Sequence, residues 1–169
     1  TPNKVATVIK YLILGILFGI ALPCAGIGFR YMLSDRLHSS RDLRDSSLNV
    51  LGTYNQQTKH RQELDRILMD IQTLAGEAQL TSVYMNALSD DDLSRQVTDE
   101  YARALSEAGL SANVGTGVAE CATELKKMIA SKGCVLVAEV GKATFQQLEQ
   151  QLELCARFQV AVLGCIVIE

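Results

Sequence analysis

The sequence predicts one transmembrane helix followed by a small α/β domain with a doubly wound, mostly parallel sheet. Two observations lead to this fold class. Residues 11–29 form an apolar run, and the chain after residue 55 alternates β-prone runs with stretches of helical periodicity. A chain of 169 residues holds one compact domain and an appendage. We therefore expect a transmembrane helix and juxtamembrane segment over 1–54 and an α/β domain over 55–169.

The apolar run over 11–29 is long enough to cross a bilayer. Its nineteen residues carry no charge, and as a helix they would span about 28 Å, close to the thickness of the hydrocarbon layer. A secretory signal peptide is one alternative, but its apolar core is shorter and precedes a small-residue cleavage site, whereas Arg30 follows here. A buried core helix is the other alternative, but such a helix is rarely apolar on every side.

The basic residues that flank this run predict its orientation. Lys4 and Lys10 precede it, and four arginines follow it: Arg30, Arg36, Arg41 and Arg44. Because the more basic flank stays in the cytoplasm, we expect the residues after 30 to be cytoplasmic and the protein to lie in the cell inner or plasma membrane. The four arginines are then expected to contact anionic lipid headgroups.

Small residues within the run predict a helix-packing surface. Gly15 and Gly19 have the spacing that lets two membrane helices approach closely. Pro23 has no backbone N–H and is expected to kink the helix near Gly19. We therefore expect Gly15, Gly19 and Pro23 to lie where this helix packs against another.

The periodicity of the remaining chain predicts its elements in order. Apolar residues over 64–75 recur at helical spacing, and residues 80–87 form a short β-prone run. Every fourth residue from Leu93 to Leu105 is apolar, which predicts an amphipathic helix that ends near Gly109.

The alternation continues to the last residues. The sequence predicts a strand, a helix, a strand, a helix and a strand over 110–114, 118–129, 134–140, 145–156 and 160–168. Strands that alternate with helices are typical of a parallel sheet covered on both faces. The last two strands are apolar along their whole length, as interior parallel strands must be.

Charge and cysteine usage exclude several classes of protein. Residues 1–54 carry six basic against three acidic side chains, and residues 55–169 carry ten against sixteen. Neither part is basic enough for nucleic acid to be the partner. The cysteines form no CxxC pair, so we expect no zinc site but buried, reduced thiols in a reducing compartment. They are Cys24, Cys121, Cys134, Cys155 and Cys165.

The loop after the first predicted strand is where a phosphate would bind, because open α/β sheets hold ligands at the carboxyl ends of their strands. Residues 86–94 (NALSDDDLS) contain neither the glycines nor the lysine of a phosphate-binding loop. Asp90, Asp91 and Asp92 are instead expected to cap the following helix with their own carboxylates, which would repel a phosphate. A metal site of these three aspartates is the alternative, although consecutive side chains converge on one ion only through a special turn.

A second possible phosphate-binding position is Gly141-Lys142, between a predicted strand and a predicted helix. Ala143 stands where a P-loop has serine or threonine, so we expect an ordinary turn with a solvated lysine. The sequence thus predicts no catalytic, cofactor-binding or metal-binding residue.

A family resemblance rests on an ordered set of short motifs. Pro2, the apolar run, Arg30-Tyr31, Asp35-Arg36-Leu37, the SSRDL of 39–43 and the VLG of 50–52 follow one another. This order resembles the second transmembrane region of bacterial polysaccharide co-polymerases, the chain-length determinant proteins. Residues 60–169 resemble the tyrosine autokinase domain fused to many of them, through 100–109 (EYARALSEAG), 134–144 (CVLVAEVGKAT) and 162–167 (VLGCIV).

The departures from that kinase domain concern its chemistry. The Gly-Lys-Ser of its Walker A motif would fall near 92–95 and is missing, as are the strand with metal-binding aspartates and the tyrosine-rich tail. The resemblance therefore implies a shortened, degenerate domain, similar to a P-loop kinase without the P-loop. None of the family's catalytic residues can be carried over to this sequence.

The resemblance implies a non-catalytic membrane scaffold or regulator of capsular or exopolysaccharide chain length and export. It also implies a homo-oligomer that works with the polysaccharide polymerase and export machinery. The alternatives are a tyrosine autokinase that binds ATP through a non-standard loop, and a membrane activator of a separate tyrosine kinase. The chain starts at Thr1, and we expect it to be the C-terminal part of a longer protein with an extracytoplasmic domain before Thr1.

Overall fold

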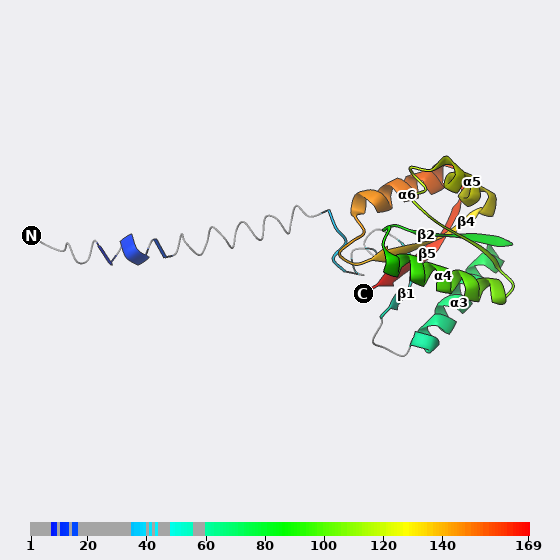
Figure 1. Ribbon diagram of the computed structural model, residues 1–169, viewed down its shortest axis with the longest axis horizontal. Helices are drawn as coiled ribbons and strands as arrows, with labels where there is room; N and C mark the ends of the chain where they lie inside the picture. Colours follow the sequence, from blue (N-terminus) through cyan, green and yellow to red (C-terminus); the bar gives the residue numbers. More distant parts are fainter. Residues whose placement is uncertain are drawn as a thin grey trace, which may run out of the picture. The chain divides into compact units, whose positions relative to one another are not determined.

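The computed structural model describes residues 8–9, 11–13, 15–16, 35–39, 41, 43, 48–55 and 60–169. The chain divides into two units, Thr1–Asp35 and Arg36–Glu169. In the first unit, the described residues between 8 and 16 are helical, and the second unit holds an α/β domain (Figure 1).

The prediction of a membrane-spanning helix is wrong. Among the residues that the structure describes, no helix is both long enough and apolar enough to cross a membrane. A spanning helix needs about 20 mostly apolar residues, whereas α3 (His60–Glu77), the longest described helix, has six charged side chains among its 18 residues. Of the predicted span over 11–29, the structure describes only 11–13, 15 and 16. The transmembrane part of the fold class and the inner-membrane location, with its cytoplasmic orientation, are therefore corrected.

The second unit is built on a five-stranded sheet in which every pair of neighbouring strands is parallel. The strands are β1 (Val50–Tyr54), β2 (Ser82–Ala87), β3 (Ser111–Thr116), β4 (Gly133–Glu139) and β5 (Ala161–Ile168). Their order across the sheet is β1-β5-β4-β2-β3. The α/β alternation that the periodicity predicts is confirmed, with α4 (Asp92–Glu107), α5 (Ala122–Ser131) and α6 (Phe145–Arg157) between successive strands.

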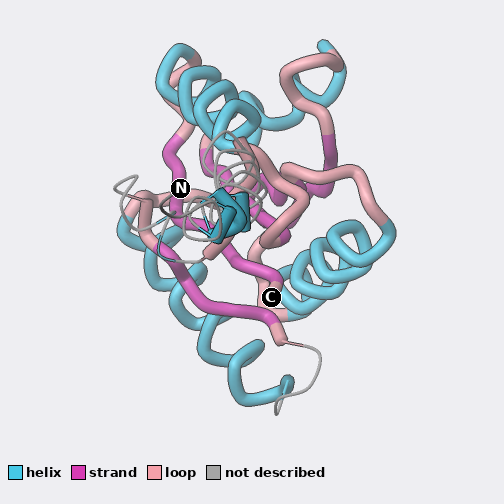
Figure 2. Tube along the Cα trace, turned by 90° about the vertical axis from the view of Figure 1, so that its left-hand side faces the viewer, coloured by secondary structure: helices cyan, strands magenta, loops and turns pink. Residues whose placement is uncertain are grey.

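Helices cover both faces of this sheet, and each face has its own core. On the first face, Ile71 of α3 and Tyr101 of α4 pack with Val135 of β4. On the second face, Met128 of α5 and Leu148 of α6 form a core with the strand residues that point to that face, such as Leu136 of β4. Because neighbouring residues of a strand point to opposite faces, an unbroken apolar strand such as β4 supplies both cores. Figure 2 shows the strands enclosed between these helices.

The strand β1 was not predicted from the sequence. It pairs with β5 at one edge of the sheet, with Val50 opposite Cys165 and Tyr54 opposite Ile168. The residues of the VLG motif are therefore part of the sheet. Their place in the sheet is not evident from the sequence, because the pairing partner of β1 lies more than a hundred residues further along the chain.

The approach of β1 to the sheet requires glycine at 164. A Cβ atom at that position would lie 2.6 Å from the carbonyl oxygen of Asn49 and 2.6 Å from Cγ of Leu51. The first of these atoms belongs to the backbone, so the contact cannot be relieved by rotating a side chain. Gly164 thus sets the distance between β5 and the segment that leads into β1.

We predict that Gly164→Ala lowers the free energy of unfolding by about 1–3 kcal/mol, the usual cost of inserting a methyl group into a packed region. Urea unfolding of the full chain measures the change. Gly76→Ala is the matched control, because a Cβ atom there meets nothing within 4 Å. That variant should be unchanged or up to about 1 kcal/mol more stable, since alanine favours a helix. Equal stability of Gly164→Ala and the wild type would contradict the described packing of β1.

Candidate functional site

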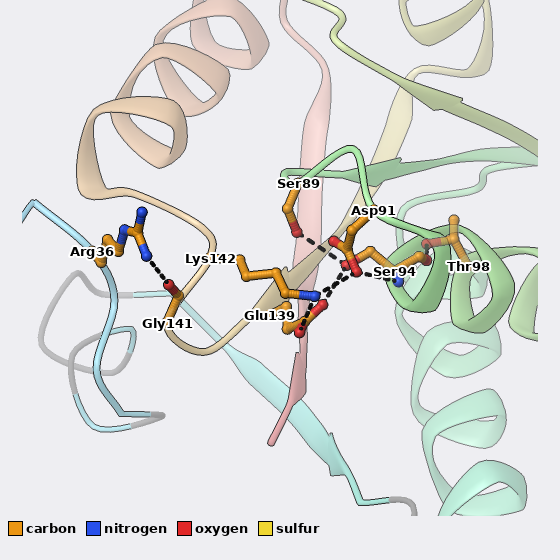
Figure 3. A network of polar contacts seen from close by, with 8 residues as sticks. All are labelled: Arg36, Ser89, Asp91, Ser94, Thr98, Glu139, Gly141 and Lys142. Atoms are coloured by element: carbon orange, nitrogen blue, oxygen red, sulfur yellow. Dashed lines mark hydrogen bonds and ion pairs between the residues drawn. The ribbon is translucent and has the colours of Figure 1, made fainter.

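The carboxyl ends of β2 and β4 form the crevice in which open α/β sheets bind ligands. The two strands are neighbours in the sheet, but β2 leads to α4 on the first face and β4 leads to α6 on the second. A crevice arises where the connections of adjacent strands diverge in this way. The loops at this point are 88–91 and 140–144, and Figure 3 shows the polar contacts between them.

Asp91 caps the first turn of α4. Its Oδ2 accepts a hydrogen bond from the backbone N–H of Ser94 at 3.2 Å, so the prediction of a self-capped helix is confirmed at this position. Asp90 points elsewhere and forms an ion pair with Arg95. The aspartates therefore do not converge on one point, and no three acidic, histidine or cysteine side chains of the described residues are placed to hold a metal ion.

Lys142 joins the two loops across the crevice. Its Nζ lies 3.1 Å from Oδ2 of Asp91 and 2.7 Å from Oε1 of Glu139, the last residue of β4 (Figure 3). The prediction of a turn with a solvated lysine is confirmed, since the side chain is 49% exposed, but the sequence did not predict that its ammonium group lies between two carboxylates. We call Asp91, Ser94, Glu139 and Lys142 the Lys142 network.

Ser94 connects this network to the interior. Its hydroxyl donates to Oε2 of Glu139 at 3.2 Å and lies 3.0 Å from the hydroxyl of Ser89. Its carbonyl oxygen accepts a hydrogen bond from the hydroxyl of Thr98 at 2.6 Å. Ser94 and Thr98 are fully buried. The first turn of α4 is therefore tied to the end of β4 as well as capped by Asp91.

The network keeps its charges fixed at neutral pH. Burial alone would raise the pKa of Asp91, but the hydrogen bond from the backbone N–H of Ser94 and the ammonium group of Lys142 lower it well below its usual range. Hydrogen bonds with Glu139 and Asp91 raise the pKa of Lys142. Asp91 is thus an anion and Lys142 a cation over the whole physiological range. The arrangement is suited to hold two loops together and leaves the ammonium group already engaged.

A segment that precedes the sheet is fastened beside this network. Leu37 donates its backbone N–H to the carbonyl of Ala143 at 2.9 Å and accepts from the N–H of Gly141 at 2.7 Å. The guanidinium group of Arg36 donates to the carbonyl of Gly141 at 3.2 Å (Figure 3). Leu37 and Leu43 are buried in the core of the second face. The 140–144 loop is therefore held from the side opposite Asp91.

The residues predicted to pack helices or contact lipid do not assemble into a site among the described residues. A Cβ atom at Gly15 would meet nothing within 4 Å. Arg36 bonds to the 140–144 loop, and Arg41 is exposed, with its backbone N–H donating to the hydroxyl of Ser39 at 3.3 Å. The other four predicted residues lie outside the described residues: Gly19, Pro23, Arg30 and Arg44.

Three of the five cysteines confirm the expected burial. Cys134, Cys155 and Cys165 are buried free thiols in the core of the second face. Burial raises the pKa of Cys165 to about 12, so this thiol stays protonated. Cys121 differs from the expectation because it is exposed, at the N-cap of α5. Cys24 lies outside the described residues.

Comparisons with known proteins identify no family for this chain. No family model matches the chain, and no curated protein shows significant similarity to it. The resemblance to polysaccharide co-polymerases therefore rests on the motifs quoted above.

We predict that Asp91→Asn lowers Tm by roughly 1–3 °C at pH 7 and low salt, because asparagine still caps the helix but loses the screened attraction to Lys142. The pKa of Asp91 is lowered by folding. Its stabilising effect is therefore complete above the unfolded pKa of about 4 and declines below it. Thermal unfolding should show a constant deficit above about pH 5 and a smaller one at pH 3. A deficit that grows on acidification would contradict the assigned ion pair.

Proposed function

We propose that this protein is a non-catalytic regulator of capsular or exopolysaccharide chain length and export, and that its α/β domain is a kinase-like fold that does not bind nucleotide. The Lys142 network is the single observation that carries the statement that the domain does not bind nucleotide. Asp91 occupies the first turn of α4 and pairs with Lys142 of the facing loop, at the position where a nucleotide phosphate would need that turn and that ammonium group free. The polysaccharide role rests on the family resemblance of the sequence.

The charge at the crevice supports this proposal. An anion bound at a helix N-terminus requires free backbone N–H groups and a positive potential. Here the N–H of Ser94 already donates to Asp91, whose second oxygen, Oδ1, is buried without a hydrogen-bond partner. A phosphate would therefore have to displace the Asp91 carboxylate from this N–H. It would also compete with Glu139 for the ammonium group of Lys142.

One observation favours the alternative of ATP binding through a non-standard loop. Lys142 lies within 3.1 Å of the N-cap residue of α4, and an ammonium group beside a helix N-terminus is what a phosphate-binding site needs. The two functions differ in whether a nucleotide can displace Asp91 from this position. Titration of the nucleotide decides between them.

We predict that calorimetric titration of the full chain with Mg²⁺-ATP or Mg²⁺-ADP shows no binding up to millimolar nucleotide. In contrast, Asp91→Ser should gain millimolar affinity for ADP and inorganic phosphate, because serine keeps the cap while removing one of the two carboxylates that engage Lys142. Asp92→Ser is the control, since it removes the same charge from the same turn and leaves both ion pairs of Lys142 in place. Mg²⁺-dependent binding by the wild type would overturn the proposal and establish the alternative.

The polysaccharide role has its own test in cells that produce the polymer. We predict that deleting this protein broadens the size distribution of the surface polysaccharide, measured by gel electrophoresis. Re-expression of the wild type should restore the distribution. Lys142→Met should restore it as well, because a domain that does not bind nucleotide loses no phosphate contact with this lysine. An unchanged distribution after deletion would contradict a role in chain length, whatever the calorimetry shows.

A further inference from the structure

A second concave site lies at the carboxyl ends of β2 and β3, beside the start of α6. It is a pocket of about 200 Å³ within the described residues of the α/β unit. A single water takes about 30 Å³ of liquid volume, so one water would not fill it. Its polar lining includes Asn86, Asp90, Thr116, Glu120, Gln150 and Gln151. We call this site the Asn86 pocket.

Asn86 is the residue that points to a ligand. Its side chain is only 2% exposed, and its Oδ1 is buried without a hydrogen-bond partner. Strand alternation places it on the same face as Tyr84, which is the face that α5 and α6 cover. A buried acceptor left unpaired is costly, and such groups are nearly always paired in folded proteins. The amide oxygen therefore has no donor within the described residues, and Asn86 belongs to the lining of the pocket.

A second buried amide in the same pocket is also weakly satisfied. Gln151 is 3% exposed, and its Nε2 donates only to sulfur atoms, at 3.0 Å to Sδ of Met128 and 3.7 Å to Sγ of Cys155. Thioether and thiol sulfurs are weak acceptors. Gln151 therefore lacks a strong acceptor, a need that a ligand with donors alone leaves unchanged, so the chemistry of a ligand is set by Asn86 and by the charges of the lining.

The charges at this pocket select the sign of the ligand. The carboxylates of Asp90 and Glu120 belong to its lining, and no lysine or arginine does. Asp90 already forms an ion pair with Arg95, whereas Glu120 is exposed at the end of the loop after β3. An anion would be repelled here. A cation with several N–H donors would satisfy both the amide oxygen of Asn86 and the carboxylates.

We infer that the Asn86 pocket binds a guanidinium group. A guanidinium carries five donors and no acceptor, is always charged and is weakly hydrated, so it can enter a partly apolar pocket more easily than an ammonium. The group is supplied either by an arginine side chain of a partner protein or by a small free guanidine compound. This inference does not depend on the proposed function, because the pocket and the Lys142 network share none of their residues.

The ligand test follows the backbone amides of the full chain by ¹⁵N NMR during titration. The probes are an acetylated and amidated Gly-Arg-Gly peptide, its citrulline counterpart and ethylguanidine. We expect saturable shifts at Ala87, Leu88 and 116–118 with the arginine peptide, and at least tenfold weaker binding of citrulline, which has the same shape without the charge. Tighter binding of the peptide than of ethylguanidine assigns the source to a protein, and the reverse assigns it to a small molecule. The absence of saturable shifts at these amides with both the arginine peptide and ethylguanidine would overturn the inference, whether or not acetate or phosphate shifts them.

The variant test separates a binding role of Asn86 from a structural one. Asn86→Leu removes the unpaired acceptor at nearly constant shape, so its Tm should be unchanged or higher while the affinity for the arginine peptide falls at least tenfold. Asn113→Leu on β3 is the control, because Asn113 lies outside the pocket and donates to Ser131 at 3.1 Å. Should Asn86→Leu not fold, the exposed Glu120→Gln still tests the site, with an expected loss of several-fold in affinity. Unchanged affinity in the tested variant would contradict the assignment.

Discussion

The parallel pairing of β2 with β4 is the constraint on which both sites of this protein depend. The register runs from Tyr84 opposite Cys134 to Ala87 opposite Val137, so β4 continues only two residues beyond the end of β2, to Glu139. The chain then departs to opposite faces of the sheet, and the loops that follow the strands are left facing each other. A shift of this register would separate Asp91 from Lys142 and would turn Asn86 away from its pocket, because side chains alternate between the faces of a strand.

The Lys142 network uses the crevice of the fold for cohesion. In a phosphate-binding α/β protein, the first turn of a helix and a nearby ammonium group are left free for the ligand. Here the helix carries its own anion in Asp91, and the ammonium group is shared with Glu139. Both halves of a phosphate site are thus present and neutralise each other. The buried hydroxyl of Ser94 extends the arrangement into the interior and fixes the relative position of α4 and β4.

Close contacts around the sheet add two further constraints. Gly164 lets the segment before β1 approach β5, and the 36–43 segment contributes Leu37 and Leu43 to the core of the second face. The same segment holds the 140–144 loop through Leu37 and Arg36, on the side away from α4. The position of Lys142 is therefore determined by contacts from both sides of its loop. This rigidity is consistent with a site whose charges stay paired.

The sequence by itself determined the local structure of the α/β domain, whereas the tertiary structure decided which side chains meet. Helical and strand periods predicted α3 to α6 and β2 to β5, and the aspartates before Leu93 predicted the helix cap, because these features depend on residues close together in the chain. Hydropathy also led to the membrane helix over 11–29, which the structure corrects, because no helix of the described residues is long and apolar enough to cross a membrane. The pairs Asp91–Lys142 and β1–β5, and the unpaired oxygen of Asn86, could not be predicted. They arise from strand order, and strand order brings together residues whose separation along the chain gives no sign of contact.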